Sequence, residues 1–334
     1  ESNEGLALVS TTDLSRTVIP TDVPWTTPPK PWAWHRTGLM VVSYGTRLVD
    51  GETRPALGRT NVLVKDFQTL EGVPADMDGA TIGLSPGGEW LYLSTLGGEV
   101  WRLAAVPFPW DGQCVPGFSE SITKTAGIHE TLVTSASSPV SPSGLLLIQA
   151  QRESRFDLEV MAADGSARTV IFEGVDGGAY TTGWGANGQS VITVAKGELI
   201  ELSWTKPGLP QPNDVMVRPL YAETGEVAVG PGGAHVALLQ RLDNRVVVID
   251  VASGLKLASL VAEADQGIAW SEDGVHLAFV QTFTDIYEEY PVTHTDIVIY
   301  DALQSSLTRA TQLLSDPDMG WTHESHPTWA VTLP

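Results

Sequence analysis

The sequence predicts an all-β fold, a seven-bladed β-propeller of four-stranded antiparallel blades. Three observations lead to this prediction. A short turn motif recurs seven times along the 334 residues, strand-like runs follow its copies, and no segment shows the sustained apolar spacing of an amphipathic helix. Rings of six or eight blades are the alternatives.

The recurring motif is a polar turn that starts with Trp or an aliphatic residue and in most copies ends with Gly, as in "WSEDG" at 270–274. Successive copies lie 41 to 56 residues apart. Such a period is typical of architectures in which each repeat forms one supersecondary unit. The residues that open the seven copies are Trp34, Leu84, Val140, Trp184, Val229, Trp270 and Trp321.

Strand-like runs follow the turns, and in the sixth copy they are "HLAFVQT" and "DIVIYDA". Both are rich in the β-branched and aromatic residues that suit a pleated, half-buried sheet. Each repeat is therefore predicted to form a small antiparallel sheet of about four strands. A lone sheet of this kind cannot bury both faces, whereas a ring of sheets can and leaves only short, protected edges.

The whole chain, residues 1–334, is predicted to form this one propeller domain. The turns place blades one to six at approximately 31–75, 80–128, 133–174, 179–222, 226–262 and 267–314. Only one strand follows the seventh turn, so the strand-like runs Leu6–Val9 and Arg16–Ile19 are expected to complete the ring. Blade seven then combines 319–334 with 5–20, and the alternative is a Pro-rich leader over 1–30 beside six blades.

The sixth repeat resembles the WD40-like repeat of TolB-type β-propellers. The core of that repeat is roughly Trp-Ser-Pro-Asp-Gly, then an Ile-Ala-Phe strand and an Asp-Ile-Tyr strand. The copies "LSPGG", "VSPSG" and "VGPGG" keep the Pro and Gly but lack the Asp. The resemblance implies a propeller fold and, often, an extracytoplasmic location. The matching residues are Trp270, Ser271, Asp273, Gly274, Leu277, Ala278, Phe279, Asp296, Ile297 and Tyr300.

Composition narrows the range of functions. The net charge is −21, which argues against nucleic acid and against an anionic membrane surface as partners. The single cysteine, Cys114, excludes an intrachain disulfide and a metal site built on several thiolates. No apolar run approaches the ~20 residues that span a bilayer, so no membrane insertion is expected. Because the chain starts at Glu1 without Met, we expect that a signal peptide or anchor was removed, although a trimmed chain would look the same.

Two possible catalytic or metal motifs have ordinary structural explanations. "GLSPG" at 83–87 matches the nucleophile elbow of hydrolases, but that motif needs a strand-to-helix turn, and a strand-like run follows Ser85. The histidines of "HESH", His323 and His326, together with His35 in the matching turn of the next blade, are weak candidates for a metal site. Turn residues at a propeller rim are usually solvated, which is the alternative.

Acidic residues precede the innermost strands of several blades and should gather at one mouth of the central channel. A ring of carboxylates there could hold Ca²⁺ or attract a cationic partner. Solvated loop charges are the ordinary alternative, and no other cofactor is implied. These residues are Asp78, Glu226, Asp265, Asp316 and Asp318.

Long insertions between the middle strands are expected in blade one, at 45–60, and in blade six, at 282–295. Both should open on the same face as the acidic mouth. The second insertion combines aromatic anchors with a polar rim, a combination favoured at protein interfaces, unless the aromatic residues only pack the insertion onto its own blade. The candidate partner-binding residues are Phe283, Tyr287, Glu288, Glu289 and Tyr290.

These observations favour a non-enzymatic binding or scaffolding propeller, exported or associated with the cell envelope, that recognises a protein or peptide on its loop face. Two alternatives remain open. One is an extracellular propeller enzyme, such as a metal-assisted lyase, lactonase or hydrolase that acts at the channel mouth. The other is a carbohydrate-binding propeller that uses exposed Trp residues. A propeller fold hosts many roles, so fold cannot decide between these hypotheses.

Overall fold

The computed structural model describes the following parts of the chain. They are residues 6–9, 16–19, 25–34, 40–61, 66–69, 77–104, 119–123, 128–133, 138–175, 182–185, 188–223, 225–240, 242–262, 268–271, 273–287 and 290–310.

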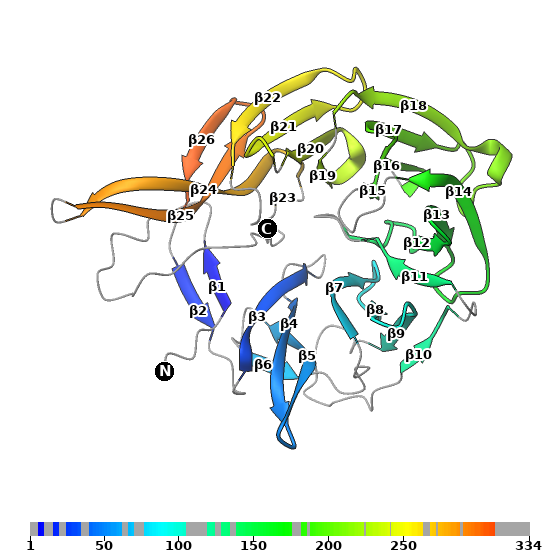
Figure 1. The fold of residues 1–334 in the computed structure, drawn as a ribbon, viewed down its shortest axis with the longest axis horizontal. Coiled ribbons are helices and arrows are strands. Elements are labelled where there is room, and N and C mark those ends of the chain that lie inside the picture. Colours follow the sequence, from blue (N-terminus) through cyan, green and yellow to red (C-terminus); the bar gives the residue numbers. More distant parts are fainter. Residues whose placement is uncertain are drawn as a thin grey trace.

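The described residues are almost entirely β and form six four-stranded antiparallel sheets, which Figure 1 shows arranged around a ring. The first sheet consists of β3 (Trp25–Trp34), β4 (Met40–Val49), β5 (Glu52–Asn61) and β6 (Asp66–Thr69). The second consists of β7 (Met77–Leu84), β8 (Trp90–Thr95), β9 (Val100–Ala104) and β10 (Ser119–Ser121). The third consists of β11 (His129–Leu132), β12 (Leu146–Arg152), β13 (Arg155–Met161) and β14 (Arg168–Val175).

The remaining sheets repeat this order of strands. The fourth consists of β15 (Thr182–Trp184), β16 (Ser190–Ala195), β17 (Glu198–Ser203) and β18 (Met216–Tyr221). The fifth consists of β19 (Glu226–Val229), β20 (His235–Gln240), β21 (Arg245–Asp250) and β22 (Lys256–Val261). The sixth consists of β23 (Ile268–Trp270), β24 (His276–Tyr287), β25 (Tyr290–Asp301) and β26 (Ser306–Arg309). The helices in the described residues are short 3-10 turns, η2 (Pro212–Asp214) and η3 (Pro231–Gly233).

Two further strands, β1 (Leu6–Val9) and β2 (Arg16–Ile19), pair only with each other, from Leu6 opposite Ile19 to Val9 opposite Arg16. They form the two strands expected near the N-terminus. In Figure 1 this hairpin lies between the sixth sheet and the first, and β1 contacts β3. The C-terminal strand with which it was expected to pair, within 319–334, lies outside the described residues.

The first sheet begins earlier than the turn pattern indicated, because the Pro-rich stretch from Trp25 onward forms its innermost strand, β3. The pairing of β3 with β4 shifts register three times, between Trp25 and Ala33. Proline has no N–H for the ladder and has a fixed φ, so a strand with prolines at positions 28, 29 and 31 pairs irregularly. This explains why the segment resembled a leader rather than a strand.

The turn motif lies where the innermost strand of each sheet turns back into the second strand. In five of the sheets the opening residue of the motif ends the innermost strand, as Trp184 ends β15 and Trp270 ends β23. In the third sheet Val140 instead forms an isolated bridge with Leu146. Gly274, which ends the sixth motif, has a φ of 68°, as a tight turn closed by glycine requires. Trp321 lies outside the described residues.

The core consists of apolar clusters formed where neighbouring sheets pack face to face. Leu158 and Val160 of the third sheet, for example, share a cluster with Val191 and Leu202 of the fourth. The motif tryptophans add a directional contact across these interfaces. Trp184 donates from Nε1 to the carbonyl oxygen of Pro139 at 3.0 Å, and Trp270 donates to that of Ala228 at 3.0 Å. Each acceptor is the residue just before the opening residue of the motif in the neighbouring sheet, Val140 or Val229. The same hydrogen bond therefore recurs with the sequence motif.

Candidate binding face

The turn between the second and third strands of each sheet lies at the same end of the ring as the start of the innermost strand. This follows because consecutive strands within each sheet run antiparallel. We call this end the hairpin face. The backbone of Asp78, in β7, and Glu226, the first residue of β19, belong to it. The topology therefore brings the predicted insertions and these two predicted acidic positions to one end of the ring.

The hairpins on this face differ greatly in length. In the fourth sheet, Ala195 pairs with Glu198 and only the two residues between them form the turn. In the sixth sheet the equivalent pair is Gln281 and Asp296, and regular pairing continues to the tip of the hairpin. We call residues 282–295 the blade-six arm. Strand β23 pairs with β24 only up to Phe279, so the outer part of the arm projects beyond the sheet (Figure 1).

The first sheet carries a second, shorter arm, residues 46–55. Its strands pair continuously from Gly45 opposite Ala56 to Val49 opposite Glu52. Both segments predicted as insertions are therefore extensions of strands already present in the sheet, and Figure 1 shows both hairpins pointing away from the ring. Asp50 and Gly51 form the tip of this shorter arm, both with positive φ.

Part of the predicted binding set lies in the described residues. Glu226 is buried, with 9% of its surface exposed, so little of this residue is accessible to a partner. Tyr287 and Tyr290 form the last cross-strand pair of the blade-six arm. The side chains of Asp78, Tyr287 and Tyr290 are not described. The residues of the set that lie outside the described part of the chain are Asp265, Glu288, Glu289, Asp316 and Asp318, and the same holds for the metal candidates His35, His323 and His326.

Phe283, predicted as an aromatic anchor, lies at the base of the arm and is half-buried. The guanidinium carbon of Arg309 lies 4.2 Å from the centre of its ring, and the His294 ring is stacked beside it at 6.3 Å. Arg309 also donates to the buried carboxylate of Asp296, whose Oδ2 lies 3.2 Å from Nε2 of His294. This cluster ties both strands of the arm to β26, so Phe283 packs the arm onto its own blade.

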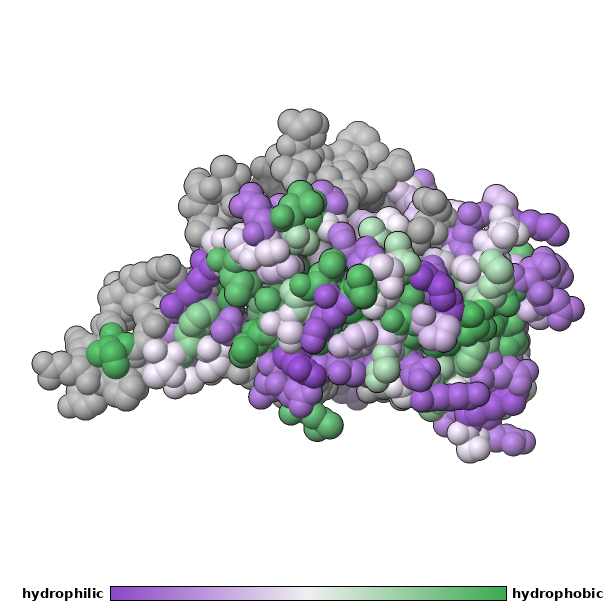
Figure 2. Space-filling model, turned by 90° about the horizontal axis from the view of Figure 1, so that it is seen from above, coloured by the Kyte–Doolittle hydropathy of each residue, from purple (hydrophilic) through white to green (hydrophobic). Residues whose placement is uncertain are grey.

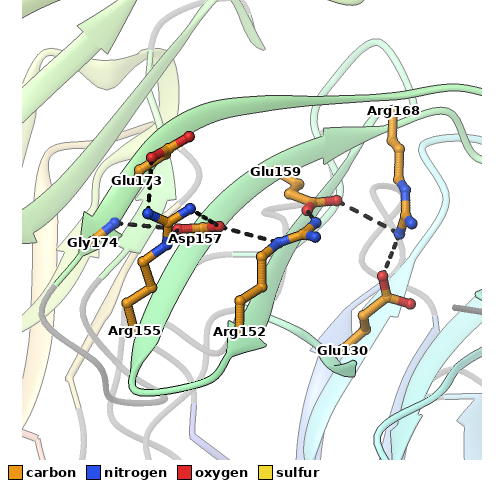
Figure 3. A network of polar contacts seen from close by, with 8 residues as sticks. All are labelled: Glu130, Arg152, Arg155, Asp157, Glu159, Arg168, Glu173 and Gly174. Atoms are coloured by element: carbon orange, nitrogen blue, oxygen red, sulfur yellow. Dashed lines mark hydrogen bonds and ion pairs between the residues drawn. The ribbon is translucent and has the colours of Figure 1, made fainter. Parts of the chain in front are cut away.

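The most extensive polar network in the described residues lies on the third sheet and was not expected from the sequence (Figure 3). Three of its carboxylates, Glu130, Asp157 and Glu159, are each only 1% exposed. Arg152 donates to Glu159 and lies 3.1 Å from Asp157, while Arg168 donates to Glu130. The hydrogen bond from Arg152 to Glu159 raises the pKa of the guanidinium, so this arginine stays charged.

The outer end of the network reaches the hairpin face. Arg155, at the start of β13, lies 3.0 Å from Oδ1 of Asp157 and 3.0 Å from Glu173. Asp157 also accepts a 3.4 Å hydrogen bond from the N–H of Gly174, where a bulge shifts the register of β14. Guanidinium groups pair with all three buried carboxylates. Such groups serve to hold strands together and are poorly suited to proton transfer or metal binding.

The serines of the turn motif have structural roles. The Oγ of Ser85 accepts a 3.0 Å hydrogen bond from the N–H of Trp90, and Ser141 and Ser271 do the same for Leu145 and His276. The turn at Ser85 is followed by a strand, β8, and not by the helix that a nucleophile elbow needs. The repeated bond explains why a serine recurs at this position.

The described residues provide neither a clustered set of metal ligands nor a membrane-spanning helix. They hold no group of three or more His, Cys, Asp or Glu side chains placed to bind a metal. None of their helices has the length and apolar character to cross a bilayer. The calcium site and the histidine cluster stay predictions, because most of their residues lie elsewhere in the chain.

The outer wall of the ring is a mixed surface. Large apolar side chains are exposed on the outermost strands, and Figure 2 shows hydrophobic residues interspersed with hydrophilic ones over the side of the ring that carries β18 and β22. Scattered exposed apolar residues are normal on soluble proteins. The exposed residues on these strands are Met216, Val217, Leu257, Val261 and Leu307.

The structure of this chain is similar to several solved structures, although its sequence matches no protein-family model and no curated protein. One similar solved structure is a puromycin hydrolase S511A mutant complexed with PGG, with 14% identity and a TM-score of 0.59, matching 99% of this chain and 52% of that one. Another is an oligogalacturonate lyase in complex with manganese, with 12% identity, a TM-score of 0.56 and coverage of 87% and 77%. A third is Chaetomium thermophilum Sqt1 bound to the N-terminus of the ribosomal protein L10, with 18% identity, a TM-score of 0.50 and coverage of 83% and 73%.

The fold is a β-propeller. The matched structures agree with the four-stranded antiparallel sheets and with the repeat that the sequence contains. At these identities the likeness concerns the fold alone. The matched propellers include a hydrolase, a lyase and a protein bound to another protein, so the β-propeller fold does not separate binding from catalysis.

Proposed function

We propose that this β-propeller is a non-enzymatic binding or scaffolding protein that recognises a protein or peptide partner on its hairpin face. The observation that carries the proposal is the blade-six arm, which continues regular strand pairing from Gln281 opposite Asp296 to Tyr287 opposite Tyr290. The fourth sheet closes the same connection with two residues. The ring therefore does not need the arm in order to form a blade.

Ordering the arm has a large conformational-entropy cost when it contacts nothing else. Fixing the backbone of each residue costs roughly 1–2 kcal/mol, and a two-stranded hairpin alone is marginally stable in water. The cluster of Phe283, His294 and Arg309 offsets part of that cost at the base. A partner that binds the arm accounts for its regular strand pairing, because a binding element that is already ordered loses less conformational entropy on binding.

The charged groups described elsewhere support binding over catalysis. The buried carboxylates of the third sheet are neutralised by arginines, and the motif serine Ser85 is occupied by a turn hydrogen bond. A general acid or base needs a pKa matched to its task and access to a substrate. The burial of these carboxylates, each 1% exposed, removes that access to a substrate.

We further propose that the ring has seven blades and that the β1–β2 hairpin belongs to the seventh. Its place between the sixth and first sheets and its contact with β3 support this. Deletion of residues 1–20 would then leave an unpaired sheet edge, which should cause aggregation or a large loss of thermal stability. A deleted chain that melts within a couple of degrees of the full chain would overturn the seven-bladed ring.

The function is tested by capture of the native partner combined with elemental analysis. The bait is the full chain, and the matched control replaces residues 284–293 with Lys-Gly, the turn that the fourth sheet uses, and so keeps Phe283 and His294. We expect a protein retained by the full chain and lost by the control, with no stoichiometric metal. A bound metal at one equivalent together with turnover of a lactone, uronate or peptide substrate would show that the protein is an enzyme instead.

A further inference from the structure

The two faces of the blade-six arm differ. One face carries Phe283 and His294, which are packed against Arg309 at the base. Side chains alternate between faces along a strand, so the residues next to these two in sequence point the other way. That second face pairs threonine with threonine, 282 with 295 and 284 with 293, and ends with Ile286 opposite Pro291.

The second face is open to solvent in its outer half. Thr284 and Thr293 are exposed, and their hydroxyl oxygens lie 3.2 Å apart. Ile286, one step further out, has 72% of its surface exposed. An isoleucine held this far from the core gains nothing from folding, whereas a partner that covers it would remove its apolar surface from water. We call Thr284, Ile286 and Thr293 the threonine face.

The charge of the arm limits the partner. Between Gln281 and His294 the sequence contains three acidic residues, Asp285, Glu288 and Glu289, and no lysine or arginine. The whole chain carries a net charge of −21, which disfavours a second copy of itself as the occupant. A positively charged partner is attracted both by the whole protein and by this arm.

We infer that the threonine face docks a basic polypeptide segment that places an apolar side chain against Ile286, while its lysine or arginine side chains are attracted by the negative charge of the arm. This inference rests on the proposed binding function and adds the chemistry of the partner. The threonine hydroxyls supply hydrogen-bond donors and acceptors, and their methyl groups supply apolar contact. Ile286 is the anchor, and the carboxylates provide long-range attraction.

The test uses short random peptides displayed on phage, selected on the full chain. The selected peptides are then measured by fluorescence anisotropy against the full chain and three variants. Ile286→Ser removes the anchor, and Glu288→Gln with Glu289→Gln removes two of the three acidic charges between Gln281 and His294. The matched control is Leu242→Ser, because Leu242 is fully exposed on the short turn of the fifth sheet.

We expect the selected peptides to combine lysine or arginine with an aliphatic or aromatic residue. Ile286→Ser should weaken binding by about tenfold or more, mainly through faster dissociation. The double Gln variant should weaken binding severalfold at low salt and little at high salt, because screening already removes the attraction there. Leu242→Ser should bind like the full chain, and circular dichroism should show all three variants folded.

The outcomes separate this inference from the proposed function. Peptides without basic residues, or peptides that bind Ile286→Ser and Leu242→Ser equally well, would overturn the threonine face while leaving a binding propeller in place. Self-association that depends on Ile286, measured by sedimentation, would show that the occupant is a second copy and would also overturn it. If no peptide is selected and native capture also fails, the proposed function fails with it.

Discussion

The repeated tryptophan hydrogen bond predicts a specific loss of stability when the indole N–H is removed. In the variant Trp270→Phe the ring stays aromatic, but the 3.0 Å bond to the carbonyl oxygen of Ala228 is lost. Trp270 is 8% exposed, so water cannot easily replace the donor. An unsatisfied buried polar group costs about 1–3 kcal/mol, and the smaller ring leaves a cavity that adds roughly 1 kcal/mol. We expect a loss of about 2–4 kcal/mol in the free energy of unfolding.

The assay is urea unfolding followed by far-UV circular dichroism, which follows the loss of strand structure rather than the fluorescence of the replaced tryptophan. Trp101→Phe is the matched control, because the Nε1 of Trp101 also donates a hydrogen bond, but to the exposed carboxylate of Glu99. That exchange should cost below about 1 kcal/mol. Trp184→Phe, which removes the equivalent bond to Pro139, should match Trp270→Phe.

The same series examines the seventh repeat. If Trp321 has the same role against the sixth sheet, Trp321→Phe should lose about as much stability as Trp270→Phe. The interpretation of the motif as a bond between sheets is refuted if Trp270→Phe stays within about 0.5 kcal/mol of the parent chain, the usual range for surface changes. It is also refuted if Trp270→Phe and Trp101→Phe lose equal amounts.

Three further predictions concern stability. Gly274→Val should cost about 1–3 kcal/mol in urea unfolding because of its φ of 68°, while Gly274→Asn, which tolerates that φ, should cost less. Glu159→Gln should lose about 2 kcal/mol, below the full cost of a broken buried pair because its arginine is 32% exposed, whereas Glu173→Gln at the exposed end should lose under about 0.5 kcal/mol. Burial of Asp273 opposes ionisation, yet hydrogen bonds led by that from Ser271 hold its pKa below the ordinary 3.8. This stabilisation is present above pH 3.8 and lost as the pH falls through the folded value, so acid titration of Asp273→Asn should show a shallower loss.

The sequence predicts the ring and its turns well because both follow from local rules. The sixth motif combines Trp270, which ends a strand, with Gly274, whose positive φ closes the turn, and similar combinations recur at a regular period. The start of β3 is harder to predict, since its prolines argue against a strand. That strand forms because β4 pairs with it across several register shifts.

The polar network of the third sheet shows why buried charge is difficult to predict from sequence. In β13 the acidic residues Asp157 and Glu159 alternate with Leu158 and Val160, a pattern that normally indicates an exposed face. Both are buried because this face packs towards the second sheet, where Tyr92 and Val100 cluster with Met161. The arginines that neutralise them come from three different strands, so only the tertiary structure reveals the pairs.

Stability and recognition are separable in this molecule because different parts of the sequence serve them. The ring is stabilised by apolar clusters between sheets, by the tryptophan bonds and by neutralised carboxylates, and none of these lies in the outer half of the blade-six arm. The outer half of the arm exposes Ile286 to solvent and contributes little to that core. Replacement of residues 284–293 by Lys-Gly, which keeps the paired Phe283 and His294 at the base, should therefore leave the urea midpoint nearly unchanged while it abolishes binding. If the shortened chain unfolds at a much lower urea concentration, the arm supports the ring, and its projection no longer argues for a partner.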